Sequence, residues 1–326
     1  MNILLTGATG FLGYRTLEYL IELPYVNKII ATGRVLKNTH SIDHEKVTYV
    51  LGDLTDSLFV SSIMNNIDVI INTASLSSPW GRIEQFMQAN VVTQKKLIHY
   101  AQKNKVKRFI YISSPSIYYN GKDRFLVKED DPLPKKFVNN YSKTKRSAEK
   151  LLENSKLNYI ILRPRAIIGR GDSVIMPRLI SAYTLGKLKI IGTGNNTVDL
   201  TSVKNVAHAI ELSIRANDKA CNQSYNITNG KPVFLWNYIN KVIKEIGMKK
   251  IDKKVKFKTA YFAAIVFEFI SKYITKKEPP LTKYSVGILS KSFTLDISKA
   301  KKFLNYKPII TTDDSLNEFV KWYKNE

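Results

Sequence analysis

Three glycines follow a short apolar run at the start of the chain, which reads MNILLTGATGFLG. The run NILLT is typical of a buried strand, and residues 11–20 have the apolar spacing of an amphipathic helix. Gly7, Gly10 and Gly13 therefore lie in a strand-to-helix turn. Gly7 permits the tight turn, Gly10 lets a ligand approach the backbone, and Gly13 allows close packing of helix on strand. Because the first N–H groups of a helix are unpaired, this turn is suited to a pyrophosphate.

Further apolar runs alternate with helical segments along the first half of the chain. They read KIIATG, VTYVLG, DVIINTA, RFIYISS and NYIILRP. Between them lie longer segments such as residues 83–104, where Phe86, Ala89, Val92 and Leu97 fall near one helical face. This alternation predicts a parallel sheet with right-handed crossovers. We therefore expect an α/β fold built on a doubly wound parallel sheet of the Rossmann type.

The length of the chain allows more than one domain. Its 326 residues, 44% of them hydrophobic, suffice for one large or two modest domains. We expect a nucleotide-binding domain from residues 1–166 and 196–229. A smaller C-terminal α/β substrate domain would use residues 167–195 and 230–326. Since ligands bind beyond the carboxyl ends of the strands in such sheets, the smaller domain must complete the pocket.

The net charge of +24 raises the question of a nucleic-acid or membrane partner. The lysines are spread thinly, and the sequence has no zinc-finger spacing, RNA-binding strand pattern or helix-turn-helix. We interpret the charge as a solvated surface and expect no nucleic-acid partner and no metal site. Cys221 is the only cysteine, which excludes an intrachain disulfide. With no signal-peptide pattern, these features predict a cytoplasmic protein.

One segment combines basic and apolar character. Residues 249–258, KKIDKKVKFK, are the densest basic stretch, and residues 259–274 after them are apolar but interrupted by Glu268 and Lys272. The apolar part is shorter than the roughly 20 residues that span a bilayer. Two interpretations stay open. The segment is a helix that lines an apolar pocket, or residues 249–274 make peripheral contact with a membrane surface.

The spacing Gly-x-x-Gly-x-x-Gly in TGATGFLG resembles the extended branch of the short-chain dehydrogenase/reductase superfamily, which includes the NAD-dependent epimerases and dehydratases. The resemblance implies cofactor contacts along the first turn and at later strand ends. In the turn these are Gly7, Thr9, Gly10, Phe11, Leu12 and Gly13. Further along they are Asp53 and Leu54 at the adenine, Ala74 in the NTAS turn beneath the cofactor, and Pro164 near the nicotinamide.

The second strand indicates which dinucleotide is bound. An NAD enzyme usually places a carboxylate at its end to accept hydrogen bonds from the ribose 2′-OH, but this chain reads ATGRVLK. Arg34 and Lys37 can instead make charge-assisted hydrogen bonds to a 2′-phosphate. We therefore expect NADP rather than NAD.

The segment YSKTK supplies a candidate proton-transfer pair. Tyr141 and Lys145 are four residues apart and share one face of a helix. An ammonium placed there favours the phenolate, lowers the Tyr pKa and makes the phenol a competent general acid or base. The segment follows YISSPSIYY by the distance that the superfamily uses between catalytic Ser and Tyr. Ser114 aligns best with that hydroxyl, and Ser113 and Ser116 are its competitors.

Other residues match the family less specifically. Asn90 matches a frequent Asn of the family, with a structural role or a role in proton relay. Arg170, between two glycines, adds a positive charge near the site where the family commonly has small residues or Pro-Gly. Whether Arg170 and Arg165 meet an acidic substrate group or solvent stays open, while Arg163 is better explained as structural because it closes a strand.

Several segments point to one subgroup. They are Trp80-Gly81, SSPSIYY, RPRAIIGRGD at 163–172, TVDLTSVKNVAHAIELSI at 197–214 and YNITNGKPVFLWNYI at 225–239. Together they most resemble the 3β-hydroxysteroid dehydrogenase-like group, over essentially the whole chain. That group includes sterol 4α-carboxylate 3-dehydrogenases and the β-keto acid reductase of bacterial olefin synthesis.

The resemblance implies an NADP-dependent oxidoreductase that interconverts a secondary alcohol and a ketone. Tyr141 would exchange the proton, Ser114 would orient the substrate oxygen, and Lys145 would hold the nicotinamide ribose. Aromatic residues between 257 and 273 suit a large hydrophobic substrate, either a β-keto or β-hydroxy acid or a steroid-like molecule. The resemblance also implies a homodimer.

Two other functions stay open. A nucleotide-sugar epimerase or dehydratase would need groups for a diphosphate, and Arg178, Lys187 and Lys189 are candidates. A non-catalytic sensor that binds NADP is less consistent with a complete Ser, Tyr and Lys set.

Overall fold

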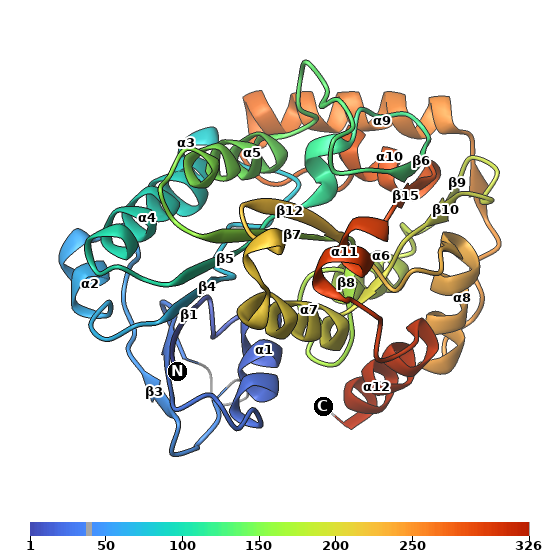
Figure 1. Cartoon of the computed structure of the whole chain (residues 1–326). Coiled ribbons are helices and arrows are strands. Elements are labelled where there is room, and N and C mark those ends of the chain that lie inside the picture. The colour runs from blue at the N-terminus through green and yellow to red at the C-terminus, as the bar shows by residue number, and fades with distance from the viewer. Residues whose placement is uncertain (37–40, 326) are drawn as a thin grey trace.

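Seven parallel strands form the central sheet of the computed structural model, which describes residues 1–36 and 41–325 (Figure 1). They lie in the order β12-β7-β5-β4-β1-β2-β3, and every neighbouring pair is parallel. The strands are β1 (Asn2–Thr6), β2 (Lys28–Thr32), β3 (Val47–Tyr49), β4 (Val69–Asn72), β5 (Arg108–Ile112), β7 (Tyr159–Pro164) and β12 (Gln223–Ile227). The expected doubly wound α/β fold is confirmed, and all six apolar runs of the first half lie in this sheet.

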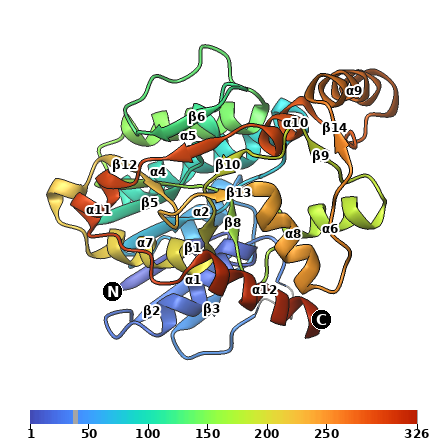
Figure 2. The ribbon, with the colours of Figure 1, turned by 90° about the vertical axis from the view of Figure 1, so that its right-hand side faces the viewer.

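Helices cover both faces of the sheet (Figures 1 and 2). One face carries α1 (Phe11–Ile21), α7 (Val203–Arg215) and α11 (Ser298–Leu304), and the other carries α2 (Ser57–Ser62), α4 (Thr93–Lys103) and α5 (Asn140–Glu153). Successive side chains of a strand point to opposite faces. Ile3 and Leu5 of β1 accordingly pack with Leu17 of α1, whereas Leu4 between them packs with Leu97 and Leu152. This alternation produces the two cores of the sheet.

The segment expected as one helix over 83–104 is interrupted. It consists of α3 (Ile83–Phe86), the π-helical turn η2 (Met87–Val92) and α4. The turn contains Asn90, whose buried side chain bonds to groups outside its own helix. π-helical turns inside helices often lie at functional sites. The apolar period alone cannot reveal such a turn, because the amide side chain and its partners come from separate segments.

Smaller sheets lie outside the central one and are built mainly from the second half of the chain, with β6 from the first half. A four-stranded sheet has the order β13-β10-β15-β6, and two pairs are β8 with β11 and β9 with β14. The strands are β6 (Arg124–Val127), β8 (Ile167–Ile168), β9 (Ile190–Ile191), β10 (Thr197–Val198), β11 (Thr201–Ser202), β13 (Val233–Phe234), β14 (Lys254–Val255) and β15 (Phe293–Leu295). The domain boundaries expected above stay a prediction.

The helices of this part pack around one apolar cluster centred on Trp236, Ile239 and Phe319. They are α6 (Met176–Thr184), α8 (Leu235–Glu245), α9 (Phe257–Ile270), α10 (Lys283–Ser290) and α12 (Thr312–Asn325), and the turn η5 (Ser271–Thr275) follows α9. Two further short turns, η3 (Pro115–Tyr118) and η4 (Asp218–Ala220), lie elsewhere in the fold. Figure 2 shows α9 at the periphery of the molecule, beside α10.

A buried amide ties the C-terminal segment to the sheet. The Asn205 Nδ2 of α7 donates to the Asn229 Oδ1 (2.7 Å) and to the Ile310 carbonyl (2.8 Å). Its Oδ1 accepts from the N–H groups of Ile309 and Ile310 at 2.7 and 3.1 Å. The segment TVDLTSVKNVA thus joins three distant parts of the chain, which accounts for an Asn inside a helix.

Candidate active site

The glycine turn after β1 packs the start of α1 against the end of the sheet. Gly7 has a φ of +71°, in the left-handed region that favours glycine. A Cβ atom there would lie 2.7 Å from the Ala74 nitrogen. A Cβ atom at Gly13 would collide with the Gly7 carbonyl oxygen. Packing between β1, β4 and α1 therefore requires two of the three glycines.

Gly10 differs from the other two because it is exposed. It is the N-cap of α1, and no side-chain hydrogen bond caps the helix there. The start of α1, with Phe11 and Leu12, therefore offers backbone N–H groups to a ligand. This unfilled cap beside an exposed glycine fits the pyrophosphate of a dinucleotide.

The end of β2 lies next to the glycine turn. Gly33 packs so closely on Thr9 that a Cβ atom at position 33 would collide with the Thr9 side chain. Arg34 follows directly and is exposed. The structure thus brings the candidate for the 2′-phosphate beside the turn, while Lys37 lies outside the described residues.

The end of β3 supplies the other group expected near the adenosine. Asp53 is exposed, and Leu54 beside it is buried in the sheet's second core. The Thr55 N–H donates to the Asp53 Oδ1 at 2.8 Å and holds the pKa of that carboxyl below its usual value. The nearby Arg34 charge lowers this pKa further.

A buried amide shapes the turn after β4. The Asn72 Oδ1 accepts from the Thr6 hydroxyl (2.6 Å) and from the Ala74 N–H (3.1 Å). Its Nδ2 donates to the Gln94 Oε1 at 2.6 Å. Asn72 therefore holds Ala74 against Gly7 and links the two strands that flank the nucleotide turn.

Asn90 ties this same turn to the helix that carries Tyr141. Its Oδ1 accepts from the Leu76 N–H at 2.8 Å and from the Ser75 hydroxyl at 3.2 Å. Its Nδ2 donates to the Thr144 Oγ1 at 3.1 Å. These bonds join the turn after β4 to α5.

Tyr141 lies in the first turn of α5, beside Ser114 at the end of β5. Burial raises the pKa of the Tyr141 phenol, and hydrogen bonds with Ser114, Ser77 and Ser75 oppose that shift. The Ser114 Oγ also donates to the Ser116 Oγ at 3.0 Å. A phenol held by serine hydroxyls at the end of a parallel strand is arranged to exchange a proton with a substrate oxygen.

Lys145 corrects one expectation. Its ammonium was expected to lower the pKa of Tyr141, but that pKa is raised by burial. The Lys145 Nζ instead donates to the Ile112 carbonyl at 2.6 Å and lies 4.5 Å from the centre of the Tyr111 ring. Burial lowers the pKa of Lys145 to about 7, and the Glu149 carboxylate opposes that shift. The spacing of Tyr141 and Lys145 predicts their shared helix face, but it does not predict how deeply Lys145 is buried.

A buried ion pair lies one helical turn beyond Lys145. The Glu149 carboxylate accepts from the Nε and Nη2 of Arg163 at 2.8 and 3.0 Å, and Arg146 adds a bond of 3.0 Å. Arg163 and Glu149 are both almost completely buried. Arg163 also donates to the Tyr118 hydroxyl. It is therefore a structural residue that joins β7 to α5.

Arg165 has a different environment from Arg163. Pro164, the last residue of β7, is buried between them. The Arg165 side chain is only 9% exposed and lies 5.0 Å from the centre of the Phe293 ring. Its Nε has no hydrogen-bond partner among the described residues. Burial lowers the pKa of Arg165 and the nearby Asp199 carboxylate opposes that shift, but among these residues the two side chains form no ion pair within 4 Å.

Tyr284 of α10 interacts with both Arg165 and Tyr141, as the shifts in the pKa of the two phenols show. Burial raises the pKa of Tyr284, while the Arg165 charge lowers it. Tyr284 in turn acts on the pKa of Tyr141. The Tyr284 phenol therefore lies near both Tyr141 and Arg165.

Two other cations expected near the site are paired elsewhere. Arg170 bonds to the Glu18 carboxylate of α1 at 2.7 and 2.9 Å. Its guanidinium is therefore in a structural contact between two segments of the protein. Arg178 lies 3.1 Å from the Glu278 carboxylate. Lys187 and Lys189 are exposed near the end of α6.

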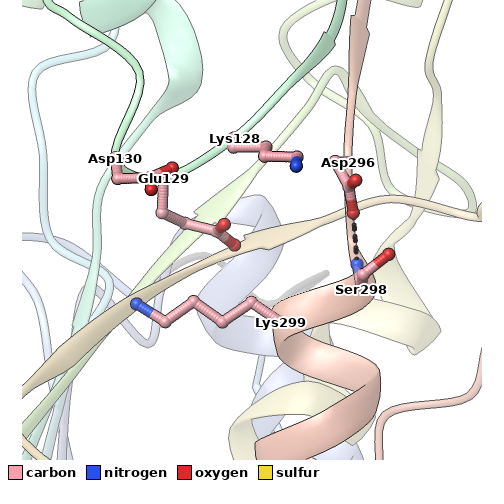
Figure 3. Close-up of a pocket in the computed structure, with 6 residues that line it drawn as sticks. All are labelled: Lys128, Glu129, Asp130, Asp296, Ser298 and Lys299. Atoms are coloured by element: carbon pink, nitrogen blue, oxygen red, sulfur yellow. Dashed lines mark hydrogen bonds between the residues drawn. The ribbon is translucent and has the colours of Figure 1, made fainter.

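A polar pocket of about 370 Å³ lies apart from these residues, between the end of β6 and the start of α11 (Figure 3). Figure 3 shows the side chains that line it, Lys128, Glu129, Asp130, Asp296, Ser298 and Lys299. The Glu129 Oε1 accepts from the Asn226 N–H at 2.7 Å, and the Ser298 N–H donates to Asp296 at 2.6 Å. None of the residues that line this pocket is among the candidate site residues predicted from the sequence.

The fold thus brings together Ser114, Asn90 and the helix that carries Tyr141 and Lys145, which come from separate segments of the sequence. Sequence reasoning missed Ser75, Ser77 and Tyr284. Ser75 and Ser77 follow a strand that was recognised, and the strand end could have drawn attention to their hydroxyls. Tyr284 carried no signal, because its position depends on how α10 packs.

Comparison with known proteins relates the whole chain to one family. The model of the NAD dependent epimerase/dehydratase family matches residues 3–228. The decarboxylating sterol-4-alpha-carboxylate 3-dehydrogenase of Candida albicans is 32% identical, with 100% of this chain and 98% of that protein covered. The 2-alkyl-3-oxoalkanoate reductase of Stenotrophomonas maltophilia is 28% identical, with 97% of each covered.

A solved structure supports the same fold. UDP-glucuronic acid 4-epimerase from Bacillus cereus, in complex with NAD, superposes with a TM-score of 0.76 at 22% identity. The similarity covers 100% of this chain and 99% of that one. At this identity the likeness concerns the fold alone.

The low pKa of Lys145 predicts a pH-dependent stability. Between about pH 7 and the ordinary Lys value near 10.4, the unfolded chain holds a proton that the folded chain lacks. The free energy of unfolding should therefore rise with pH in this window. We compare the free energy of unfolding of the wild type with that of Lys145→Met, measured by urea unfolding without cofactor. The wild-type value minus the variant value should grow by about 1 kcal/mol per pH unit. The exposed Lys143→Met is the control, with a flat difference. A flat difference for Lys145→Met as well would mean that the buried amine stays charged.

Proposed function

Because the chain belongs to the NAD dependent epimerase/dehydratase family, and to its 3β-hydroxysteroid dehydrogenase-like group, we propose that it is an NADP-dependent oxidoreductase. It interconverts a secondary alcohol and a ketone on a large hydrophobic β-keto or β-hydroxy acid. The observation that carries this proposal is the Tyr141 phenol, hydrogen-bonded to Ser114 at the carboxyl edge of the sheet.

The proposed reduction divides the work between the cofactor and the protein. When bound, the dihydronicotinamide supplies a hydride with its electron pair to the carbonyl carbon. Ser114 donates a hydrogen bond to the carbonyl oxygen and orients it. Tyr141 gives its proton to that oxygen as negative charge develops, which leaves a phenolate. The reverse reaction returns the alcohol proton to the phenolate.

Lys145 supports this step in two ways. We assign its side chain, which shares a helix face with Tyr141, to the nicotinamide ribose. A pKa of about 7 lets the amine exchange a proton near neutral pH, which suits a group that replaces the proton lost by Tyr141.

The names of the relatives suggest the chemical class of the substrate. A 3-oxoalkanoate carries its carboxylate on the carbon next to the keto carbon, and a sterol 4-carboxylate carries it on the carbon next to the one that bears the 3-oxygen. Both are β-oxygenated acids. Arg165 supports such a substrate here, because a nearly buried guanidinium without a protein hydrogen bond on its Nε suits a carboxylate.

A nucleotide-sugar epimerase or dehydratase is less well supported. Its substrate would need cations for a diphosphate, but Arg178 is paired with Glu278 and Lys187 and Lys189 are exposed. A sensor that binds NADP without turnover would leave the arrangement of Ser114 and Tyr141 unexplained.

Replacing Tyr141 by Phe removes only the hydroxyl group, which is the proposed proton donor. Tyr141→Phe should lower kcat for NADPH-dependent reduction of long-chain β-keto acids by about 10²- to 10⁴-fold, because the general acid is lost. Cofactor absorbance measures the rate, and the partly exposed Tyr323→Phe is the control that should keep full activity. If Tyr141→Phe reduced the β-keto acid at the wild-type rate, another group would have to transfer the proton.

The choice of cofactor depends on Arg34 in this proposal. Arg34→Ala should raise KM for NADPH by about tenfold or more and leave KM for NADH unchanged, because only NADPH carries the 2′-phosphate. Lys28→Ala, at the opposite end of β2, is a matched loss of exposed charge that should change neither value. Equal effects of Arg34→Ala on both cofactors would argue against a 2′-phosphate contact.

In this proposal, Arg165 binds the carboxylate of the substrate. Arg165→Met should raise KM for a β-keto acid by about ten- to a hundredfold, the cost of losing a charge-assisted hydrogen bond. The methyl ester of the same acid should be reduced equally well by both proteins. Arg170→Met, which breaks the contact with Glu18, is the control and should not distinguish acid from ester. An equal loss on acid and ester would limit Arg165 to a structural role.

A further inference from the structure

Helix α9 and the turn η5 are apolar but largely unburied. Only Ala260 and Ala264 of α9 are buried. Four large side chains of this segment are more than half exposed, with Phe262 at 68%, Phe269 at 59%, Tyr273 at 56% and Ile274 at 69%. Water-exposed apolar groups of this size are costly, so such a contiguous patch usually marks an interaction surface.

The exposed side chains form one stripe. Phe262, Ile265, Val266, Phe269 and Tyr273 have spacings of three and four residues, which place them on one helix face. The buried residues Ala260, Ala264 and Ser271 lie on the opposite face. The stripe therefore points outward along the whole segment.

The orientation of α9 is fixed by α10. The Glu268 Oε1 accepts from the Lys283 N–H at the start of α10 (2.7 Å), and the two side chains form an ion pair at 3.1 Å. Phe257 stacks on Tyr261 at the start of the helix, with ring centres 5.5 Å apart. Figures 1 and 2 both show α9 at the edge of the molecule with α10 on its inner side.

Lysines surround the stripe. Residues 249–277 contain nine lysines, with Asp252 and Glu268 as the only carboxylates. Glu268 is already paired with Lys283. The exposed lysines next to the apolar stripe are Lys253, Lys254, Lys256, Lys258, Lys272, Lys276 and Lys277. The rim of the stripe is therefore strongly positive.

We propose that this stripe is a docking surface for an anionic lipid membrane, on which α9 lies in the plane of the interface. Apolar side chains would enter the boundary between headgroups and acyl chains, while the lysines contact the lipid phosphates. Within residues 1–36 and 41–325, no helix is long and apolar enough to cross a bilayer. An orientation along the surface is thus the one that suits this helix.

Charge distinguishes a membrane from a second copy of the chain. Pairing two stripes face to face would bring two lysine rims together, and like charges at close range oppose association. An anionic bilayer offers the opposite sign. The net charge of +24 for the whole chain acts in the same direction.

Docking would also place the substrate site near the bilayer. Helix α10, which packs against α9, carries Tyr284 close to Tyr141 and Arg165. A hydrophobic acid dissolved in the membrane would then reach the site without crossing bulk water. This consequence rests on the proposed function, whereas the docking surface itself does not.

Vesicle flotation tests the proposal on the full chain. Vesicles of phosphatidylcholine with about 30% phosphatidylglycerol provide the anionic surface, and pure phosphatidylcholine vesicles are the neutral comparison. We expect wild-type protein to float with the anionic vesicles in about 0.1 M salt and much less in about 0.5 M salt. Phe262→Ser/Phe269→Ser should reduce the bound fraction at least about tenfold, because it removes two aromatic groups from the stripe.

A matched variant controls for folding and for general stickiness. Leu58→Ser/Phe234→Ser removes exposed apolar groups of α2 and β13 and should bind vesicles like wild type. Thermal unfolding and NADPH binding should be unchanged in both double variants, so a failed substrate assay would leave the docking result intact. Absence of wild-type binding to anionic vesicles, or equal binding by Phe262→Ser/Phe269→Ser, would overturn the proposal. The proposal would also be overturned if the wild type formed a dimer and bound no vesicles, and Phe262→Ser/Phe269→Ser dissociated that dimer.

Discussion

The buried pairing of Glu149 with Arg163 is the interaction on which the candidate active site depends. Arg163 belongs to β7 and Glu149 to α5, and two hydrogen bonds of 2.8 and 3.0 Å join them with almost no access to water. A buried ion pair of this kind is costly to break, because either partner alone would be an uncompensated charge. It therefore fixes α5 on the sheet. Since Lys145 and Tyr141 lie one and two turns away on the same helix, their positions follow from this contact.

The other half of the site rests on sterics rather than on charge. Gly7 and Gly13 let α1 and the turn after β4 approach β1 so closely that a side chain at either position would collide with backbone. The amides of Asn72 and Asn90 then connect this turn with α5. The nucleotide turn and the phenol of Tyr141 are thereby part of one bonded framework at the carboxyl edge of the sheet. A dinucleotide that spans this edge can reach from the start of α1 to Tyr141, as the proposed function requires.

Local patterns in the sequence were enough to predict the sheet, the glycine turn and the pair Tyr141 and Lys145. Each depends on residues within a few positions of one another, whose spacing reports strand or helix directly. The environment of Lys145 was not predictable, because its burial and its bond to Ile112 depend on β5, which is distant in sequence. The same holds for Arg165 and Arg170, which look alike in sequence, although one has no partner on its Nε among the described residues and the other is paired. The structural role of Arg163 was predictable, because this residue closes a strand.

Isotope transfer tests the central claim, that this site moves a hydride to a β-keto acid, more directly than any rate. NADPH in which deuterium replaces both hydrogens at carbon 4 of the dihydronicotinamide would be mixed with a long-chain β-keto acid and the purified protein. Hydride transfer at this site should give a β-hydroxy acid with deuterium on the carbon that carried the keto oxygen, as seen by mass spectrometry. Product without deuterium, or unchanged acid beside tightly bound cofactor, would contradict it.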